Sequence, residues 1–194
     1  FTENEEERLA IEAKINEFIE AEDQNLIGWR LVPTNEEGLS EISKSSAPIV
    51  RQVFVRKNAN DRLAFERKLY IIRKQVEHWA EEQGFEFYCP SFSSQTMVFK
   101  GLLAPEEVSN FYKDLQDESF VSAFALVHSR YSTNTFPSWK RAHPNRYIIH
   151  NGEINTLRGN INWMRAREQQ FVSEAFGDDL QKILPIIDTT GSDS

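Results

Sequence analysis

Residues 128–160 read HSRYSTNTFPSWKRAHPNRYIIHNGEINTLRGN, and this stretch carries the two most informative polar clusters of the chain. Each cluster follows a short run typical of a β-strand, residues 121–127 in the first case and 147–150 in the second. A polar segment that contains proline separates the two clusters. Because functional side chains are often carried on loops held by strand ends, we expect a binding or catalytic site here.

The first cluster, residues 128–133, places an arginine beside hydroxyl groups just past a strand. The guanidinium of Arg130 is able to hold a carboxylate through two parallel hydrogen bonds. An ordinary exposed arginine in a loop rich in Ser and Thr would show the same pattern. From this segment alone, we favour the ordinary arginine.

The second cluster contains Asn151 and Gly152, directly after the second strand-like run. The Asn151 amide and the Gly152 backbone N–H are able to donate to one oxygen, as in an oxyanion hole. The same dipeptide also forms simple turns, which is the commoner outcome. Near the end of the chain, Asp193 is a candidate partner for an ammonium group, although a plain loop aspartate is again commoner.

Several motifs in a fixed order favour the functional interpretation of these residues over the ordinary one. HSRYSTNT (128–135), HNGEINT (150–156) and GSDS (191–194) together resemble the motif set of the class II, N-terminal nucleophile glutamine amidotransferases. The longer forms YSTNTFPSW (131–139) and HNGEINTLRGNINWMRAR (150–167) are similar to the glutaminase domain of the glutamate synthase large subunit in particular. Four upstream segments also match that domain: GWRLVP (28–33), RQVFV (51–55), KLYIIRK (68–74) and SFSSQTMVFKGLL (91–103).

The resemblance implies six site residues around a bound glutamine. Asn151 and Gly152 would form the oxyanion hole of the catalytic machinery. The other four would bind the substrate: Arg130 at the α-carboxylate, Asp193 at the α-ammonium group, and Tyr131 and Thr133 along the pocket. Residues 136–144 would fold over the glutamine as a lid, with Trp139 contributing to its closure.

The nucleophile of that family is a cysteine at the mature N-terminus, and its own α-amine serves as the general base. This chain begins at Phe1, so we expect it to be an internal piece that is inactive alone. Its single cysteine, Cys89, lies in an apolar strand-like run, and we interpret it as structural. The spacing of the four histidines suits no metal motif, so we expect no metal site.

Apolar periodicity predicts an α+β chain with three main helices and several strands. We expect helices over 3–23, 60–83 (ending at Gly84) and 159–176, with shorter ones near 39–42 and from 104. We expect strands over 26–32, 49–55, 85–92, 96–103, 121–127 and 147–150, with a hairpin at 93–95. The resemblance implies a four-layer αββα N-terminal nucleophile hydrolase sandwich, incomplete without its N-terminal segment. Residues 1–194 would then be a single partial glutaminase domain, with 1–23 an acidic amphipathic helix.

Composition and charge narrow the range of partners. The net charge is −8, 27% of residues are charged, and no apolar run reaches the roughly 20 residues that a membrane span needs. Residues 130–167 hold seven basic side chains and one acidic one, which suits a small anion. The chain as a whole is too acidic for us to favour nucleic acid. A single cysteine is compatible with a reducing compartment, and we expect a cytoplasmic protein without membrane contact.

The function implied by the resemblance is hydrolysis of glutamine to glutamate and ammonia, which the parent enzyme adds to 2-oxoglutarate. The parent family implies FMN, an iron–sulfur cluster and a reduced nicotinamide or ferredoxin donor, none of them within this chain. The implied partners are the remaining synthase domains and a small reductase subunit. Two alternatives remain: a non-catalytic glutamine-binding or interaction module, and another class II amidotransferase. The NTFPSW and EINTLRGN segments argue against the second.

Overall fold

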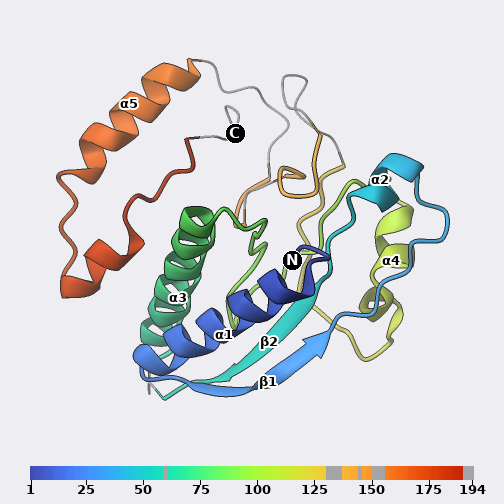
Figure 1. Ribbon diagram of the computed structural model, residues 1–194, viewed down its shortest axis with the longest axis horizontal. Coiled ribbons are helices and arrows are strands. Elements are labelled where there is room, and N and C mark those ends of the chain that lie inside the picture. Colours follow the sequence, from blue (N-terminus) through green and yellow to red (C-terminus); the bar gives the residue numbers. More distant parts are fainter. Residues whose placement is uncertain (59–60, 130–136, 144–145, 150–155, 190–194) are drawn as a thin grey trace.

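The computed structural model describes residues 1–58, 61–129, 137–143, 146–149 and 156–189 (Figure 1). Its helices and strands follow one another in this order: α1 (Glu5–Ala21), β1 (Asn25–Leu31), α2 (Glu41–Ser45), β2 (Arg51–Arg56), α3 (Arg62–Gln83), α4 (Glu107–Phe111), the 3-10 helix η1 (Lys113–Gln116), α5 (Leu157–Glu168) and the 3-10 helix η2 (Gly177–Ile183). In the described part, the strands form one two-stranded antiparallel sheet. The helices and this sheet agree with the predicted α+β class.

Helix α1 begins and packs as its sequence predicts. The side chain of Asn4 accepts hydrogen bonds from the backbone N–H groups of Glu6 and Glu7, which have no partner inside the helix. Ile11, Ile15 and Ile19 recur at four-residue steps and are buried on one face. The acidic residues lie mainly on the remaining, solvated surface of α1.

Helix α3 has both of its ends defined by side-chain chemistry. Asp61 caps the first turn by accepting from the Ala64 N–H at 2.8 Å. Gly84 ends the helix with a φ of 72°, a left-handed conformation that glycine adopts without a steric penalty. The predicted stop at Gly84 is therefore confirmed.

Helices α1 and α3 lie against one face of the β1–β2 sheet, as Figure 1 shows. Ile72 and Val76 of α3 pack with the α1 isoleucines, and sheet residues such as Trp29 and Val53 cover the cluster. Trp29 is opposite Val53 in the sheet register. A shift between Leu26 and Gly28 marks a β-bulge, which increases the local twist of the ribbon.

A second cluster lies beyond the sheet, where α2 and α4 come together (Figure 1). Its buried members are Val32, Leu39, Phe111, Tyr112 and Trp139. A third, smaller cluster joins α3 to η2 through Ile71, Leu180 and Ile183. Among the described residues, no helix has the length and apolar character needed to cross a membrane.

The predicted strands over 85–92 and 96–103 are wrong, since these described residues form no strand. The chain does reverse between them, and serine hydroxyls accept backbone N–H groups both across and within the turn. Ser91 Oγ accepts the Val98 N–H at 3.2 Å, and Ser93 Oγ accepts the Gln95 N–H at 3.0 Å. Side-chain acceptors of this kind compete with a β-ladder.

The predicted strands at 121–127 and 147–150 are not formed in the described residues either, up to residue 149. Val121, Phe124 and Val127 are 84%, 75% and 75% exposed. An extended segment gains ladder hydrogen bonds only when another strand lies beside it, and none does so in the described part of the chain.

The last predicted helix is also shorter than expected, ending at Glu168 instead of residue 176. Its final turn tightens, with the Phe171 N–H donating to the Glu168 carbonyl at 3.2 Å. The chain then changes direction, and Phe171 and Phe176 pack against the cluster between α3 and η2. Both rings are partly buried there.

Candidate functional site

The six predicted site residues fall outside the described parts of the chain. They are Arg130, Tyr131, Thr133, Asn151, Gly152 and Asp193. The structure does describe the segments that flank them: residues 61–129, then 137–143, 146–149 and 156–189. These flanking segments define where the polar stretch 128–160 attaches to the fold.

The two ends of the stretch between residues 128 and 143 meet in space. The rings of His128 and His143 lie with their centroids 4.3 Å apart and their planes at 41°. The two histidines are fifteen residues apart in the sequence, so the contact joins described segments on either side of the first polar cluster.

Trp139, within the predicted lid, is part of the second hydrophobic cluster. Its side chain is 3% exposed, and its Nε1–H donates to the Ser43 carbonyl of α2 at 3.1 Å. The Phe111 ring lies 5.1 Å away between centroids. Trp139 is therefore packed as a core residue. Its contribution to closure of a lid over residues 136–144 stays a prediction.

Arg146 fastens the second strand-like run to α3. Its guanidinium donates to the backbone carbonyl of Cys89 and lies 3.5 Å from a carboxylate oxygen of Glu77. Glu77 is also 3.5 Å from Arg73 on the same helix. Burial lowers the pKa of Arg146, while the Glu77 carboxylate opposes that shift. Arg146 thus holds the chain shortly before Asn151 against the main helix.

Cys89 is unsuited to nucleophilic attack. Its Sγ–H donates to the Ser91 carbonyl at 3.4 Å, and burial of the thiol raises its pKa to about 12. The thiolate is the reactive form of cysteine, so a thiol with this pKa is almost entirely unreactive near neutral pH. The structure agrees with the interpretation of Cys89 as a structural residue.

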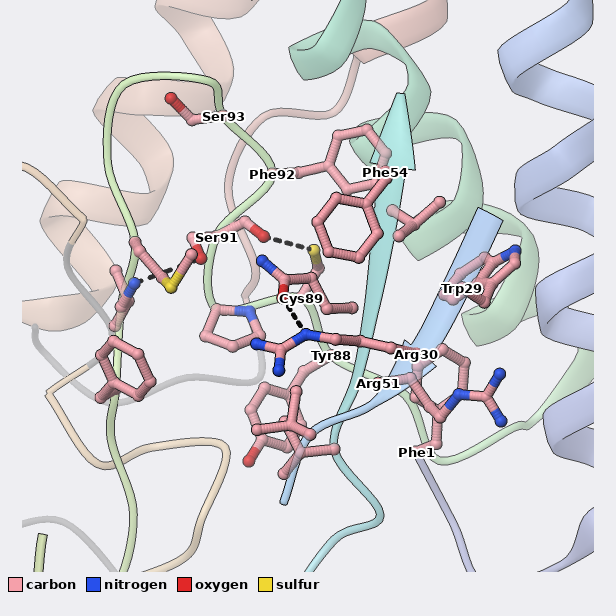
Figure 2. A pocket seen from close by; sticks show the side chains of 18 of the residues that line it. Phe1, Trp29, Arg30, Arg51, Phe54, Tyr88, Cys89, Ser91, Phe92 and Ser93 are labelled. Carbon is pink, nitrogen blue, oxygen red and sulfur yellow. Dashed lines mark hydrogen bonds between the residues drawn. The ribbon is translucent and has the colours of Figure 1, made fainter. Parts of the chain in front are cut away.

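A cavity of about 320 Å³ lies beside the β1–β2 sheet, and Cys89 is one of its lining residues (Figure 2). Its walls are mainly apolar and aromatic, with Trp29, Phe54 and Phe92 among them. Its main charged pair is Arg30 with Asp114, which satisfy each other through a two-pronged hydrogen bond. Two other charged side chains line it: Arg51 lies 3.4 Å from Glu12, and Lys100 donates to the Lys140 carbonyl.

The described residues contain no group of three or more His, Cys, Asp or Glu side chains placed to hold a metal ion. The sequence has one cysteine, so this chain cannot supply the four thiolates of an iron–sulfur cluster. The residues of this chain do not fit such a cluster.

Comparison with protein families matches residues 1–194 to the class-II glutamine amidotransferases, and the chain belongs to that family. The large chain of glutamate synthase [NADPH] from Bacillus subtilis is 64% identical over 196 residues, covering 100% of this chain and 13% of the relative. Glutamate synthase [NADH] of Schizosaccharomyces pombe is 48% identical over 176 residues, covering 87% of this chain and 8% of that relative.

A plant glutamate synthase is also similar to this chain. The chloroplastic ferredoxin-dependent glutamate synthase of Spinacia oleracea is 44% identical over 191 residues, covering 96% of this chain and 12% of the relative. The chain therefore spans between 8% and 13% of the length of these three relatives. The resemblance to the amidotransferase region of glutamate synthase is confirmed.

Sequence reasoning missed the residues that hold the polar stretch in place. Ser43 carried no signal, because its contribution to Trp139 is a backbone carbonyl. Gly101 carried none either, since the lack of room for a Cβ beside the indole is evident only in three dimensions. A tryptophan in an otherwise polar segment was the one available clue, and burial is the usual fate of so large a ring.

Proposed function

We propose that residues 1–194 are the glutamine-binding and amide-hydrolysing region of a glutamate synthase large chain. The observation that carries this proposal is the 64% identity with the Bacillus subtilis large chain over the whole of this chain. The match of residues 1–194 to the class-II glutamine amidotransferases supports it. The region would form a single partial glutaminase domain built as an αββα sandwich, with residues 1–23 as an added acidic helix.

In this proposal, glutamine is held at both of its charged ends. Arg130 binds the α-carboxylate with its planar fork, and Asp193 accepts hydrogen bonds from the α-ammonium group. Tyr131 and Thr133 line the pocket between them. Asn151 and Gly152 donate hydrogen bonds to the oxygen that becomes negative when the amide carbon turns tetrahedral.

The nucleophile is a cysteine other than Cys89, whose high pKa makes it unsuitable. Its sulfur attacks the side-chain amide carbon of glutamine, and the C–N bond breaks as the nitrogen leaves with the thiol proton as ammonia. Water then hydrolyses the thioester to glutamate. In the complete protein the ammonia would be added to 2-oxoglutarate. That reduction would use FMN, an iron–sulfur cluster and a nicotinamide or ferredoxin donor, held by other domains or a reductase subunit.

The test is release of ammonia from glutamine by the full-length protein, compared with its Asn151→Ala variant. Loss of one oxyanion-hole donor lowers kcat by about 10²–10³, and we expect KM for glutamine to change little. A variant with weaker glutamine binding and unchanged kcat would disprove the oxyanion role. Glutamine binding without any ammonia release from the unaltered full-length protein would favour a non-catalytic module instead.

A further inference from the structure

Trp139 fits into a socket formed by three separate segments of the chain. We define the tryptophan socket as Ser43 of α2, Gly101, and Phe111 of α4. The Trp139 Nε1–H donates to the Ser43 carbonyl at 3.1 Å, and the indole ring lies against Phe111. Trp139 is 3% exposed, so its ring is buried while the one polar atom of its side chain, Nε1, keeps a hydrogen-bond partner.

Gly101 permits this fit because it has no side chain. A Cβ added there would lie 2.2 Å from Cζ3 and 2.6 Å from Cε3 of the Trp139 indole. Carbon atoms that are not bonded approach to about 3.5–4.0 Å, so any larger residue at position 101 has to displace the ring. The glycine is required here by contact with a rigid aromatic ring.

Two further hydrogen bonds fasten the same segments together. Ser43 Oγ–H donates to the Leu102 carbonyl at 2.8 Å, which joins α2 to the segment that contains Gly101. Lys100 Nζ donates to the Lys140 carbonyl at 2.6 Å, which joins the residue before Gly101 to the backbone beside Trp139. The position of residues 138–142 is thus set by backbone as well as side-chain contacts.

The sequence position of Trp139 links the socket to the proposed glutamine site. It lies six residues after Thr133, and the His128–His143 contact holds the start of the same stretch. Fixing two points of any chain lowers the conformational entropy that the residues between them lose on binding a ligand.

We propose that Trp139 is a positioning residue, held by the tryptophan socket, that fixes residues 137–143 and so favours glutamine binding by the residues that precede them in the sequence. This inference rests on the proposed function. It gives α2 and α4 a part in glutamine affinity although neither carries a predicted site residue. Trp139 acts as a fixed anchor in this role and does not touch the substrate.

The experiment compares Gly101→Ala with Gly28→Ala in the full-length protein. Gly28 is a matched control because a Cβ there would meet nothing within 4 Å. Trp139→Phe is a milder variant, which keeps a ring but loses the bond to Ser43, and Trp163→Phe, on the 79% exposed Trp163, is its control. Two readouts are needed: glutamine hydrolysis kinetics, and hydrogen exchange of the amides in residues 138–143.

We expect Gly101→Ala to speed exchange in residues 138–143 and to raise KM for glutamine about tenfold, with kcat changed less than about threefold. Trp139→Phe should shift both readouts in the same direction by a smaller factor. Faster exchange with an unchanged KM would overturn the positioning role, and unchanged exchange would overturn the socket. If the unaltered protein released no ammonia, the proposed function would fail, and exchange alone would still decide whether the socket holds.

Discussion

Glu22 is a buried carboxylate that holds two lysines from distant parts of the chain. It is 2% exposed and accepts hydrogen bonds from Lys68 and Lys182, each at 2.7 Å, and from Gln75 at 3.2 Å. A buried charge is tolerated only when such partners surround it. The sequence showed an acidic first helix but gave no sign that Glu22, at its end, would be buried.

Replacing this carboxylate by an amide should destabilise the fold. In Glu22→Gln, Lys68 and Lys182 lose their shared counter-charge, and we expect the free energy of unfolding to fall by about 1–3 kcal/mol. Urea unfolding of the polypeptide followed by circular dichroism measures this change. Glu20→Gln is the control, because Glu20 is exposed on the same helix. Equal effects of the two substitutions would contradict the role of Glu22.

Asp179 should make the stability of the same region depend on pH. Its hydrogen bonds with Lys182 and Lys68 lower its pKa below the usual value of 3.8. A carboxylate with a lowered folded-state pKa stabilises the fold above its unfolded value, and the contribution is lost as pH falls through the folded pKa. We expect Asp179→Asn to destabilise the protein at pH 6 but to have a smaller effect below pH of about 3. Unfolding midpoints at both pH values check this, and an equal effect would contradict the ion pairing.

The single cysteine should be unreactive and dispensable. With the thiol pKa near 12, almost no thiolate is present at neutral pH. We expect residues 1–194 to react with a thiol reagent only after unfolding, and Cys89→Ala to leave glutamine hydrolysis by the full-length protein unchanged. Loss of ammonia release in Cys89→Ala would make Cys89 the nucleophile and overturn our interpretation.

At the scale of elements, helices were predicted well because their signals are local. The isoleucine spacing of α1 and the Asp61 and Gly84 caps of α3 all lie within a few residues of the helix they define. Strands depend on a neighbour elsewhere in the chain. The runs at 85–92 and 121–127 have strand composition, but the described part of the chain brings no strand beside them.

The cap of α3 offers a direct test at this scale. Gly84 has a φ of 72°, where an L-residue with a Cβ is strained by roughly 1–2 kcal/mol. We expect Gly84→Ala to lower the free energy of unfolding by about that amount. Nothing lies within 4 Å of an added Cβ, so the effect would come from backbone strain alone. Urea unfolding beside Gly28→Ala, whose φ is not positive, separates strain from loss of a glycine.

Across the whole molecule, the family could be predicted from the sequence, whereas the attachment of the site could not. Ordered motifs identified the class-II amidotransferases because short segments of a functional site resemble those of relatives. The burial of Trp139 against Gly101 and the meeting of His128 with His143 depend on how distant segments pack. No spacing rule along one chain encodes contacts of that kind.

The exposed apolar runs suggest how residues 1–194 behave when produced alone. Phe124 and Val127 are each 75% exposed, and Tyr147 and Ile148 add further apolar surface. Such surface favours association in water. We expect the isolated polypeptide to self-associate as its concentration rises, measured by light scattering, and the Phe124→Ser/Val127→Thr double variant to do so less. Equal scattering by both would show that these side chains are not responsible.

The bond pattern around Glu22 also sets a minimum length for any shortened version of this polypeptide. Lys182 lies 160 positions after Glu22, yet the two side chains are in direct contact. A product that stopped before Gly177 would keep the carboxylate while discarding its η2 partner Lys182, together with Asp179, which pairs with the same lysine. Protease digests should therefore leave stable products that extend beyond Ile183, and expression boundaries are best placed after that residue.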